Sequence, residues 1–90
     1  MQYRVIFTEA ARQDLKSLEK KLADRIILKI AFFGQQKDIR SFCKPLVGAG
    51  PKLFRFRIGE YRAIFRIDED GEIQILKILR IRHRKDIYDL

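Results

Sequence analysis

The sequence predicts an α+β domain with the order β-α-α-β-β-β, in which two N-terminal helices pack on one face of a small antiparallel sheet. The period of the apolar residues supports this prediction. Between Ala11 and Phe33 they recur at spacings of three and four, as on one face of a helix. From Leu53 onward they alternate with polar residues, as on a strand with one buried face. Because no repeat or long linker interrupts the 90 residues, we expect a single domain over residues 1–90.

The first third of the chain predicts a strand and two helices. The strand QYRVIF places Tyr3, Val5 and Phe7 on one face, and Thr8 can cap the helix that follows. The apolar stripe of this helix consists of Ala11, Leu15, Leu18 and Leu22. A second helix is expected from about Leu22 to Phe33, with Gly34 as its stop. Prolines and glycines in residues 35–52 predict an irregular connection.

A hairpin is predicted where LFRFRI and YRAIFRI flank Gly59-Glu60, since glycine at the first position suits a type II′ turn. A two-residue turn sets Arg57 opposite Arg62 and sorts the side chains onto two surfaces. The surface expected to face the helices holds Phe54, Phe56, Ile58, Tyr61, Ala63, Phe65 and Ile67. The other surface holds Arg55, Arg57, Arg62 and Arg66.

This arginine surface is costly for folding, because like charges directly across a strand pair repel each other. No acidic residue of the two predicted strands shares the surface. A polyanionic ligand explains the arrangement better than folding does. The alternative is that the long arginine side chains simply extend into water.

The run EIQILKILRI predicts a third strand of this sheet. A three-residue loop at 68–70, with Gly71 in a left-handed bulge position, would align Ile73 and Ile75 with the core. The arginine surface would then gain Leu76, Ile78, Arg80 and Arg82. A change of one residue in the loop would invert this register.

The overall charge points to an anionic partner. Lys and Arg outnumber Asp and Glu by 20 to 12, which gives a net charge of +8. On so small a chain this charge favours nucleic acid or an acidic protein, although a merely basic surface is the alternative. One cysteine and one histidine argue against a disulfide framework and a structural zinc site. No apolar run reaches the roughly 18 residues of a membrane span, and early charges argue against a signal peptide, so we expect a cytoplasmic protein.

Three segments together resemble the RelE/ParE toxins of bacterial and archaeal toxin–antitoxin pairs. They are YRVIFTEAARQDLKSL, KPLVGAGPKLFRFRIGEYRAIFRI and ILRIRHRKDIYDL, and the likeness covers essentially the whole chain. It implies a RelE-like microbial ribonuclease fold with a short C-terminal tail. In the RelE branch the family cleaves mRNA in the ribosomal A site without a metal or other cofactor. In the ParE branch it inhibits DNA gyrase.

The resemblance also implies roles for single residues. Arg62 matches the phosphate-binding arginine of the family, and Arg82 matches the arginine that steadies the transition state or the leaving group. Tyr88 matches a C-terminal tyrosine that stacks on a base and assists the chemistry, so it is a candidate catalytic residue, although it could instead pack against the sheet edge. The remaining cations are expected to bind RNA, and they are Arg55, Arg57, Arg66, Arg80, Arg84 and Lys85.

The general base is the open point of this assignment. Arg55 and Arg57 stand where the best-known RelE pattern has two lysines, and arginine stays protonated far above neutral pH. His83, which stands where that pattern has an acidic residue, could exchange protons at neutral pH or could be an ordinary surface histidine.

We therefore expect an mRNA interferase toxin whose partners are a cognate antitoxin, the ribosome and mRNA. The ending R-H-R-x-x-I-Y favours the RelE branch, and ParE-like members tend to have longer paired helices than residues 9–33 allow. The alternatives are a gyrase inhibitor of the ParE type and a basic binding relative without catalysis.

Overall fold

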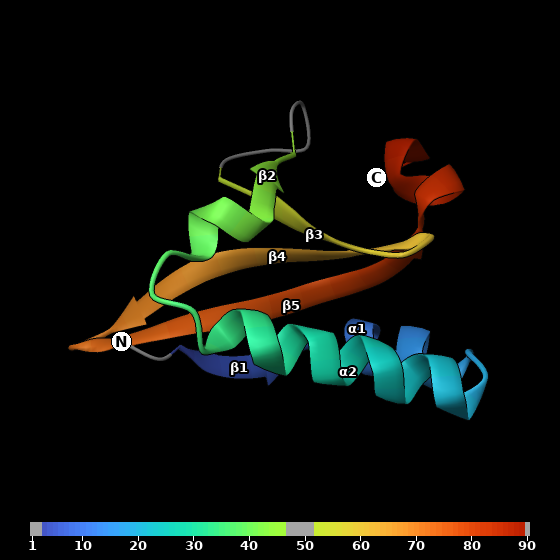
Figure 1. Cartoon of the computed structure of the whole chain (residues 1–90), viewed down its shortest axis with the longest axis horizontal. Helices are drawn as coiled ribbons and strands as arrows, with labels where there is room; N and C mark the ends of the chain where they lie inside the picture. The colour runs from blue at the N-terminus through green and yellow to red at the C-terminus, as the bar shows by residue number, and fades with distance from the viewer. Residues whose placement is uncertain (1–2, 47–51, 90) are drawn as a thin grey trace.

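The computed structural model describes residues 3–46 and 52–89 of the chain. Two α-helices pack against a five-stranded sheet with the strand order β1-β5-β4-β3-β2 (Figure 1). Two short 3₁₀ helices, η1 and η2, complete the fold. In chain order the elements are β1 (Arg4–Phe7), α1 (Glu9–Lys16), α2 (Lys20–Gly34), η1 (Ile39–Phe42), β2 (Cys43–Pro45), β3 (Phe54–Ile58), β4 (Tyr61–Asp70), β5 (Ile73–His83) and η2 (Arg84–Asp89).

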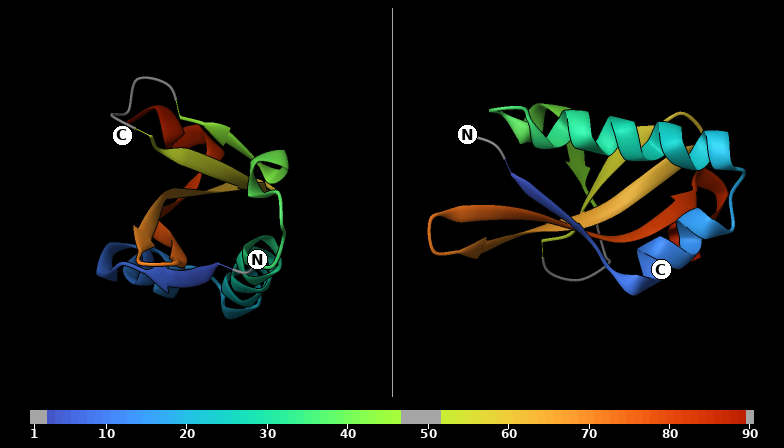
Figure 2. Two further views of the ribbon diagram at one scale, coloured as in Figure 1. Left: turned by 90° about the vertical axis from the view of Figure 1, so that its left-hand side faces the viewer. Right: turned by 90° about the horizontal axis from the view of Figure 1, so that it is seen from below.

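The predicted α+β class is confirmed, with two differences in the sheet. First, β1 pairs with β5 in parallel, while the other neighbouring strands are antiparallel. Second, the segment predicted to be an irregular connection contains η1 and the edge strand β2, which pairs with β3. In Figure 2 α1 and α2 lie on one side of the twisted sheet, and β2 and η2 lie away from them.

Both helices form close to where the sequence predicts them. The Thr8 hydroxyl oxygen accepts a hydrogen bond from the Ala11 amide at 3.1 Å, which caps α1 as expected. This helix ends at Lys16, and α2 begins at Lys20, two residues before the predicted start at Leu22. Neither helix is long and apolar enough to span a membrane, within the part of the chain that the structure describes.

Gly34 ends α2 beside β1. Its carbonyl accepts a hydrogen bond from the Tyr3 amide at 2.9 Å. A Cβ atom on Gly34 would lie 2.9 Å from Cγ2 of Val5, which is closer than side chains normally approach. Glycine therefore allows the end of α2 and the first strand to pack directly.

The core lies between the helices and one face of the sheet. The predicted apolar surface of the hairpin is confirmed: Phe56, Ile58, Ala63 and Phe65 are buried, and Phe54, Tyr61 and Ile67 pack against them. The rings of Phe33, Phe56 and Phe65 stack in succession, with centroids 4.3 and 4.1 Å apart. The helices contribute Ala11, Leu15, Ala23, Ile26 and Ile30.

The predicted register of β3 and β4 is confirmed. Arg57 lies opposite Arg62, and Ile58 lies opposite Tyr61 across the turn. Gly59 has a φ of 60°, and Glu60 does not have a positive φ, as a type II′ turn requires. The turn therefore fixes which side chains of the hairpin reach the arginine surface.

The predicted register of β5 is wrong over its first half. The strand β4 continues to Asp70, and a two-residue turn of Gly71 and Glu72 replaces the predicted three-residue loop. Leu76 and Ile78 are consequently buried in the core rather than on the arginine surface.

In the same half of β5, Ile73 is exposed instead of buried, and Ile75 lies on the face away from the core.

A β-bulge restores the prediction in the second half of β5. Phe65 pairs with Ile78, but its neighbour Ile64 pairs with Arg80, so Leu79 is one extra residue in the ladder. Beyond Leu79 the two faces exchange places. Arg80 and Arg82 therefore lie on the arginine surface as predicted. Leu76 and Ile78, which were predicted to share this surface, lie before the bulge and face the core.

Candidate nucleic-acid interface

Three arginines lie side by side across three neighbouring strands. Arg57 of β3 lies opposite Arg62 of β4, which in turn lies opposite Arg82 of β5. We call these three residues the arginine row. Adjacent strands are about 4.8 Å apart, so the row brings three positive charges close together on one surface.

Other arginines near this row are held by acidic side chains. Arg66 pairs with Asp68 at 3.0 Å, Arg80 with Asp14 at 2.8 Å, and Arg84 with Glu60 at 2.7 Å. Asp68 belongs to β4, which extends further than predicted, so the expectation that no acid shares the arginine surface is wrong for Arg66. Within the described part of the chain, no acidic side chain forms an ion pair with the arginine row, with Arg55 or with Lys85.

Arg62 is held in place by the hairpin turn. Its Nη1 donates to the carbonyl oxygens of Gly59 and Tyr61, both at 2.9 Å. Burial lowers the pKa of Arg62, and the positive charges of Arg57, Arg55 and Arg84 lower it further. The guanidinium is thus fixed by two backbone contacts in a strongly positive environment.

Arg82 has an unused donor. Its Nε is buried and has no hydrogen-bond partner among the described residues. Buried polar groups are normally paired, and none of the described residues accepts a hydrogen bond from this nitrogen. A bound anion or water would be a suitable acceptor.

A pocket of about 230 Å³ opens beside the row. Four cationic side chains from three strands line it, namely Lys44, Arg55, Arg57 and Arg62. Ser41, Phe42 and Cys43, at the junction of η1 and β2, also line the pocket. Burial raises the pKa of the Cys43 thiol, which keeps it in its neutral form.

Lys44 is a functional candidate that the sequence pattern does not reveal. In β2 it pairs with Arg55, so it joins the arginine surface from the sheet edge. The strand has only three residues and ends at Pro45, which is too short for an alternating pattern to reveal it. The pairing with β3 is what brings this lysine to the pocket.

His83 lies on the other face of the sheet. It pairs with Tyr61, and their rings meet edge to face with centroids 5.2 Å apart. Its Nδ1 accepts a hydrogen bond from the Lys85 amide at 3.2 Å. The structure therefore does not place His83 in the pocket of Arg55, Arg57 and Arg62.

A second pocket, of about 280 Å³, lies at the edge of β5 near the end of α1. Arg82 and His83 both line it, together with Asp14, Tyr61 and Asp86. Three of the four predicted catalytic residues are thus divided between two pockets. Arg62 belongs to the first pocket, and Arg82 and His83 belong to the second.

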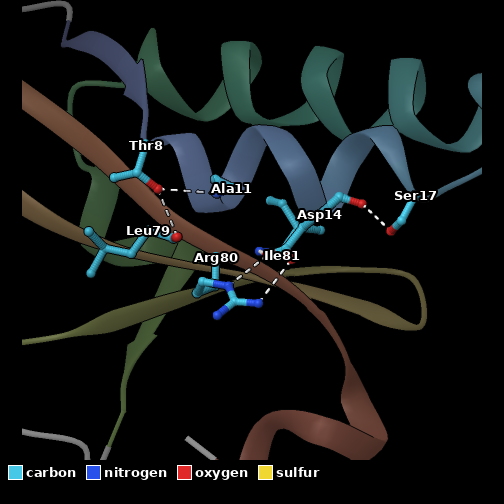
Figure 3. A network of polar contacts seen from close by, with 7 residues as sticks. All are labelled: Thr8, Ala11, Asp14, Ser17, Leu79, Arg80 and Ile81. Atoms are coloured by element: carbon cyan, nitrogen blue, oxygen red, sulfur yellow. Dashed lines mark hydrogen bonds and ion pairs between the residues drawn. The ribbon is translucent and has the colours of Figure 1, made fainter.

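Beyond the residues of β5 that pair with β1, the edge of β5 is covered by α1 and its cap (Figure 3). The Thr8 hydroxyl donates to the Leu79 carbonyl at 2.9 Å. The Asp14 carboxylate accepts from the Ile81 amide at 2.9 Å and from two nitrogens of Arg80 at 2.8 and 3.0 Å. The fold therefore holds Arg80 in place. In its predicted role Arg80 would bind RNA while its charge is already compensated by Asp14.

The same contacts set the protonation of Asp14. Burial raises the pKa of its carboxyl group, but the hydrogen bonds from Arg80 and Ile81 and the charges of Arg80 and Arg82 outweigh this effect. The net result is a pKa below the ordinary value. Asp14 remains ionised and can neutralise Arg80 over the neutral pH range.

The C-terminal residues form η2 directly after β5, next to the β3–β4 turn (Figure 1). The Arg84 amide donates to the Glu60 carbonyl at 2.8 Å, which holds the start of η2 against this turn. Arg84 and Lys85 are exposed. The backbone of Tyr88 belongs to η2, but its side chain lies outside the described part of the structure.

Comparison with known proteins identifies the family. Residues 5–88 match the family described as the ParE toxin of the type II toxin–antitoxin system parDE. Toxin RelG of Mycobacterium tuberculosis is 35% identical over 88 residues, which cover 98% of each chain.

Solved structures agree with this match. A chain in the RelBE2 toxin–antitoxin complex of M. tuberculosis is 33% identical and has a TM-score of 0.74. The superposition covers 93% of this chain and 100% of that one. A free-state structure of the E. coli toxin RelE, only 16% identical, shares the fold, with a TM-score of 0.71 over 99% of this chain and 93% of that one. The chain therefore belongs to the RelE/ParE superfamily and is a toxin of a type II toxin–antitoxin pair.

Proposed function

We propose that this toxin is a metal-independent endoribonuclease that acts in the cytoplasm and cleaves mRNA in the ribosomal A site. The arginine row is the observation that carries the proposal. Three like charges across neighbouring strands oppose folding, and no described acidic side chain pairs with them. A phosphodiester backbone would compensate these charges.

The proposed reaction is an internal transesterification. The 2′-oxygen attacks the adjacent phosphorus and loses its proton, while the bond from phosphorus to the 5′-oxygen breaks. The products are a 2′,3′-cyclic phosphate and a 5′-hydroxyl, and the second requires a proton. Preorganised cations can stabilise the charge that develops on the phosphorane.

The residues would share this work as follows. Arg62, which the turn already orients, binds the phosphate in the first pocket. Arg82, whose buried Nε has no partner among the described residues, stabilises the transition state or the leaving group. Tyr88 stacks on a base. Around them, Arg55, Arg57 and Lys85 hold the RNA backbone.

His83 has a separate place in this proposal. Its pairing with Tyr61 keeps it away from the first pocket, so it could act only from the second pocket, next to Arg82. Replacement of His83 by glutamine tests this role. Unchanged single-turnover cleavage between about pH 6 and pH 8, the range in which imidazole titrates, would remove His83 from the mechanism.

A cognate antitoxin is the expected physiological partner, because a similar toxin has been solved within a toxin–antitoxin complex. With a net charge of +8, the toxin should associate rapidly with an acidic segment, and this association should weaken as salt is added. Such a segment would neutralise the arginine surface.

Primer extension on mRNA from a translation reaction tests the proposed function. Breaks at ribosome-occupied codons that require both the toxin and ribosomes would support it, and the Arg62→Ala protein is the matched negative control. The matched family is described as ParE, so a parallel assay measures supercoiling by DNA gyrase. Inhibited supercoiling without mRNA breaks would replace our proposal by the gyrase alternative.

A further inference from the structure

We propose that Lys44 is a catalytic residue of the first pocket and gives a proton to the departing 5′-oxygen. This inference rests on the proposed RNA cleavage. Lys44 lies opposite Arg55 in the β2–β3 pair and lines the pocket with Arg55, Arg57 and Arg62. Its side chain is exposed, and no described acidic side chain forms an ion pair with it.

The chemistry of the other groups in the pocket points to this lysine. Guanidinium groups hold their protons far above neutral pH and are therefore poor proton donors. The hydroxyl of Ser41 already donates to Asp38 at 2.6 Å. An ammonium group exchanges its proton more readily than a guanidinium, and general acids work best when their pKa is close to the working pH.

Two further side chains with exchangeable protons, Cys43 and His83, are less suited to this role. Cys43 lines the pocket, but its thiol is half-buried and it packs against the core. His83 occupies the opposite face of the sheet, where it packs against Tyr61. Among the residues that line the first pocket, Lys44 is thus the side chain that combines an exchangeable proton with access to a bound phosphate.

The proton balance of the step is complete. The 2′-hydroxyl proton passes to water as the new bond to phosphorus forms. The Lys44 ammonium gives its proton to the 5′-oxygen as the bond from phosphorus to this oxygen breaks. The resulting neutral amine then regains a proton from the solvent.

The test measures single-turnover cleavage of mRNA on stalled ribosomes by the wild type, Lys44→Ala and Lys44→Arg. We expect both variants to be slowed by roughly 10²–10⁴-fold, the usual contribution of a general acid. The arginine variant keeps the charge but not the readily exchanged proton. Matched controls are Lys20→Ala and Lys20→Arg, because Lys20 is an exposed lysine at the start of α2. These controls should cleave like the wild type.

A modified substrate separates proton donation from binding. An mRNA with sulfur in place of the 5′-oxygen at the cleavage site has a leaving group that needs no proton. The Lys44 variants should cleave this substrate at the wild-type rate. Equal slowing on both substrates, full activity of Lys44→Arg, or no slowing of Lys44→Ala would each overturn the inference. A wild-type protein that fails to cleave the ordinary mRNA would instead refute the proposed function itself.

Discussion

The arginines near β5 fall into two groups that differ in their partners. At the edge covered by α1, Arg80 gives two hydrogen bonds to Asp14, which also binds the backbone of β5. On the next two strands, β4 and β3, Arg62 and Arg57 lie opposite each other, and no described acid pairs with either. Arg80 is used for folding, whereas the arginine row keeps its charge available for a ligand.

The largest loss of activity is expected when an arginine without an acidic partner is removed. Arg62→Ala and Arg82→Ala should each reduce single-turnover mRNA cleavage by about 10²–10³-fold, because each removes a preorganised cation from the reacting phosphate. Circular dichroism should show a folded chain. Arg66→Ala is the control, since Arg66 is already paired with Asp68. An equal loss of activity in all three variants would show that an acidic partner does not distinguish Arg66 from Arg62 and Arg82.

Removal of the paired acid should act on stability instead. Asp14→Asn loses charged hydrogen bonds to Arg80 and Ile81, and bonds of this kind are worth about 1.5–3 kcal/mol. We expect a lower free energy of unfolding by roughly that amount, measured by urea denaturation at pH 7. Asp24→Asn is the control, because Asp24 is exposed on α2. Equal stability of the wild type and Asp14→Asn would argue that this edge contributes nothing to the fold.

The stabilisation by Asp14 should also depend on pH. Its pKa is lowered in the folded protein, so the contribution is complete above the ordinary carboxyl pKa of about 3.9. It is lost as the pH falls through the lowered value of the folded state. The stability difference between the wild type and Asp14→Asn should therefore shrink below about pH 4. A difference that stays constant down to about pH 2 would contradict this assignment.

The smallest effect is expected when an exposed pair is opened. Asp68→Asn frees Arg66, but the two side chains are 36% and 45% exposed, so the loss of stability should stay below about 1 kcal/mol. Binding to single-stranded RNA should become slightly tighter at low salt, because one more cation is available. Unchanged RNA binding would mean that Arg66 lies outside the interface.

The sequence was most informative where turn chemistry fixed the register. The glycine of the β3–β4 turn determined which residues face each other, and with them the position of Arg57 beside Arg62. The predicted β4–β5 loop was one residue too long, and no residue type in the sequence indicated the bulge at Leu79. The correct placement of Arg82 therefore came from two errors that cancelled.

The site was less predictable than the fold, because it depends on pairings between distant segments. Lys44 reaches the pocket through a three-residue strand, and His83 is turned away by the register of β5. The position of Lys44 does not follow from periodicity along the chain, whereas His83 comes one residue after Arg82 and therefore alternates onto the opposite face. Arg80 and Asp14 are 66 residues apart, so their ion pair could not be foreseen either.

The extra residue at Leu79 also limits how the length of this protein can vary. The single strand β5 serves two surfaces in succession, with Ile78 facing the core before the bulge and Arg82 facing the arginine surface after it. Removal of Leu79 itself would make Ile78 and Arg80 neighbours that already face opposite sides, so Arg82 would stay on the arginine surface, whereas removal of Ile81 would turn Arg82 toward the core. Changes in length should therefore be tolerated at the Gly71 turn, and loss of the extra residue at Leu79 should keep both surfaces in place, but a deletion between Leu79 and Arg82 should be eliminated.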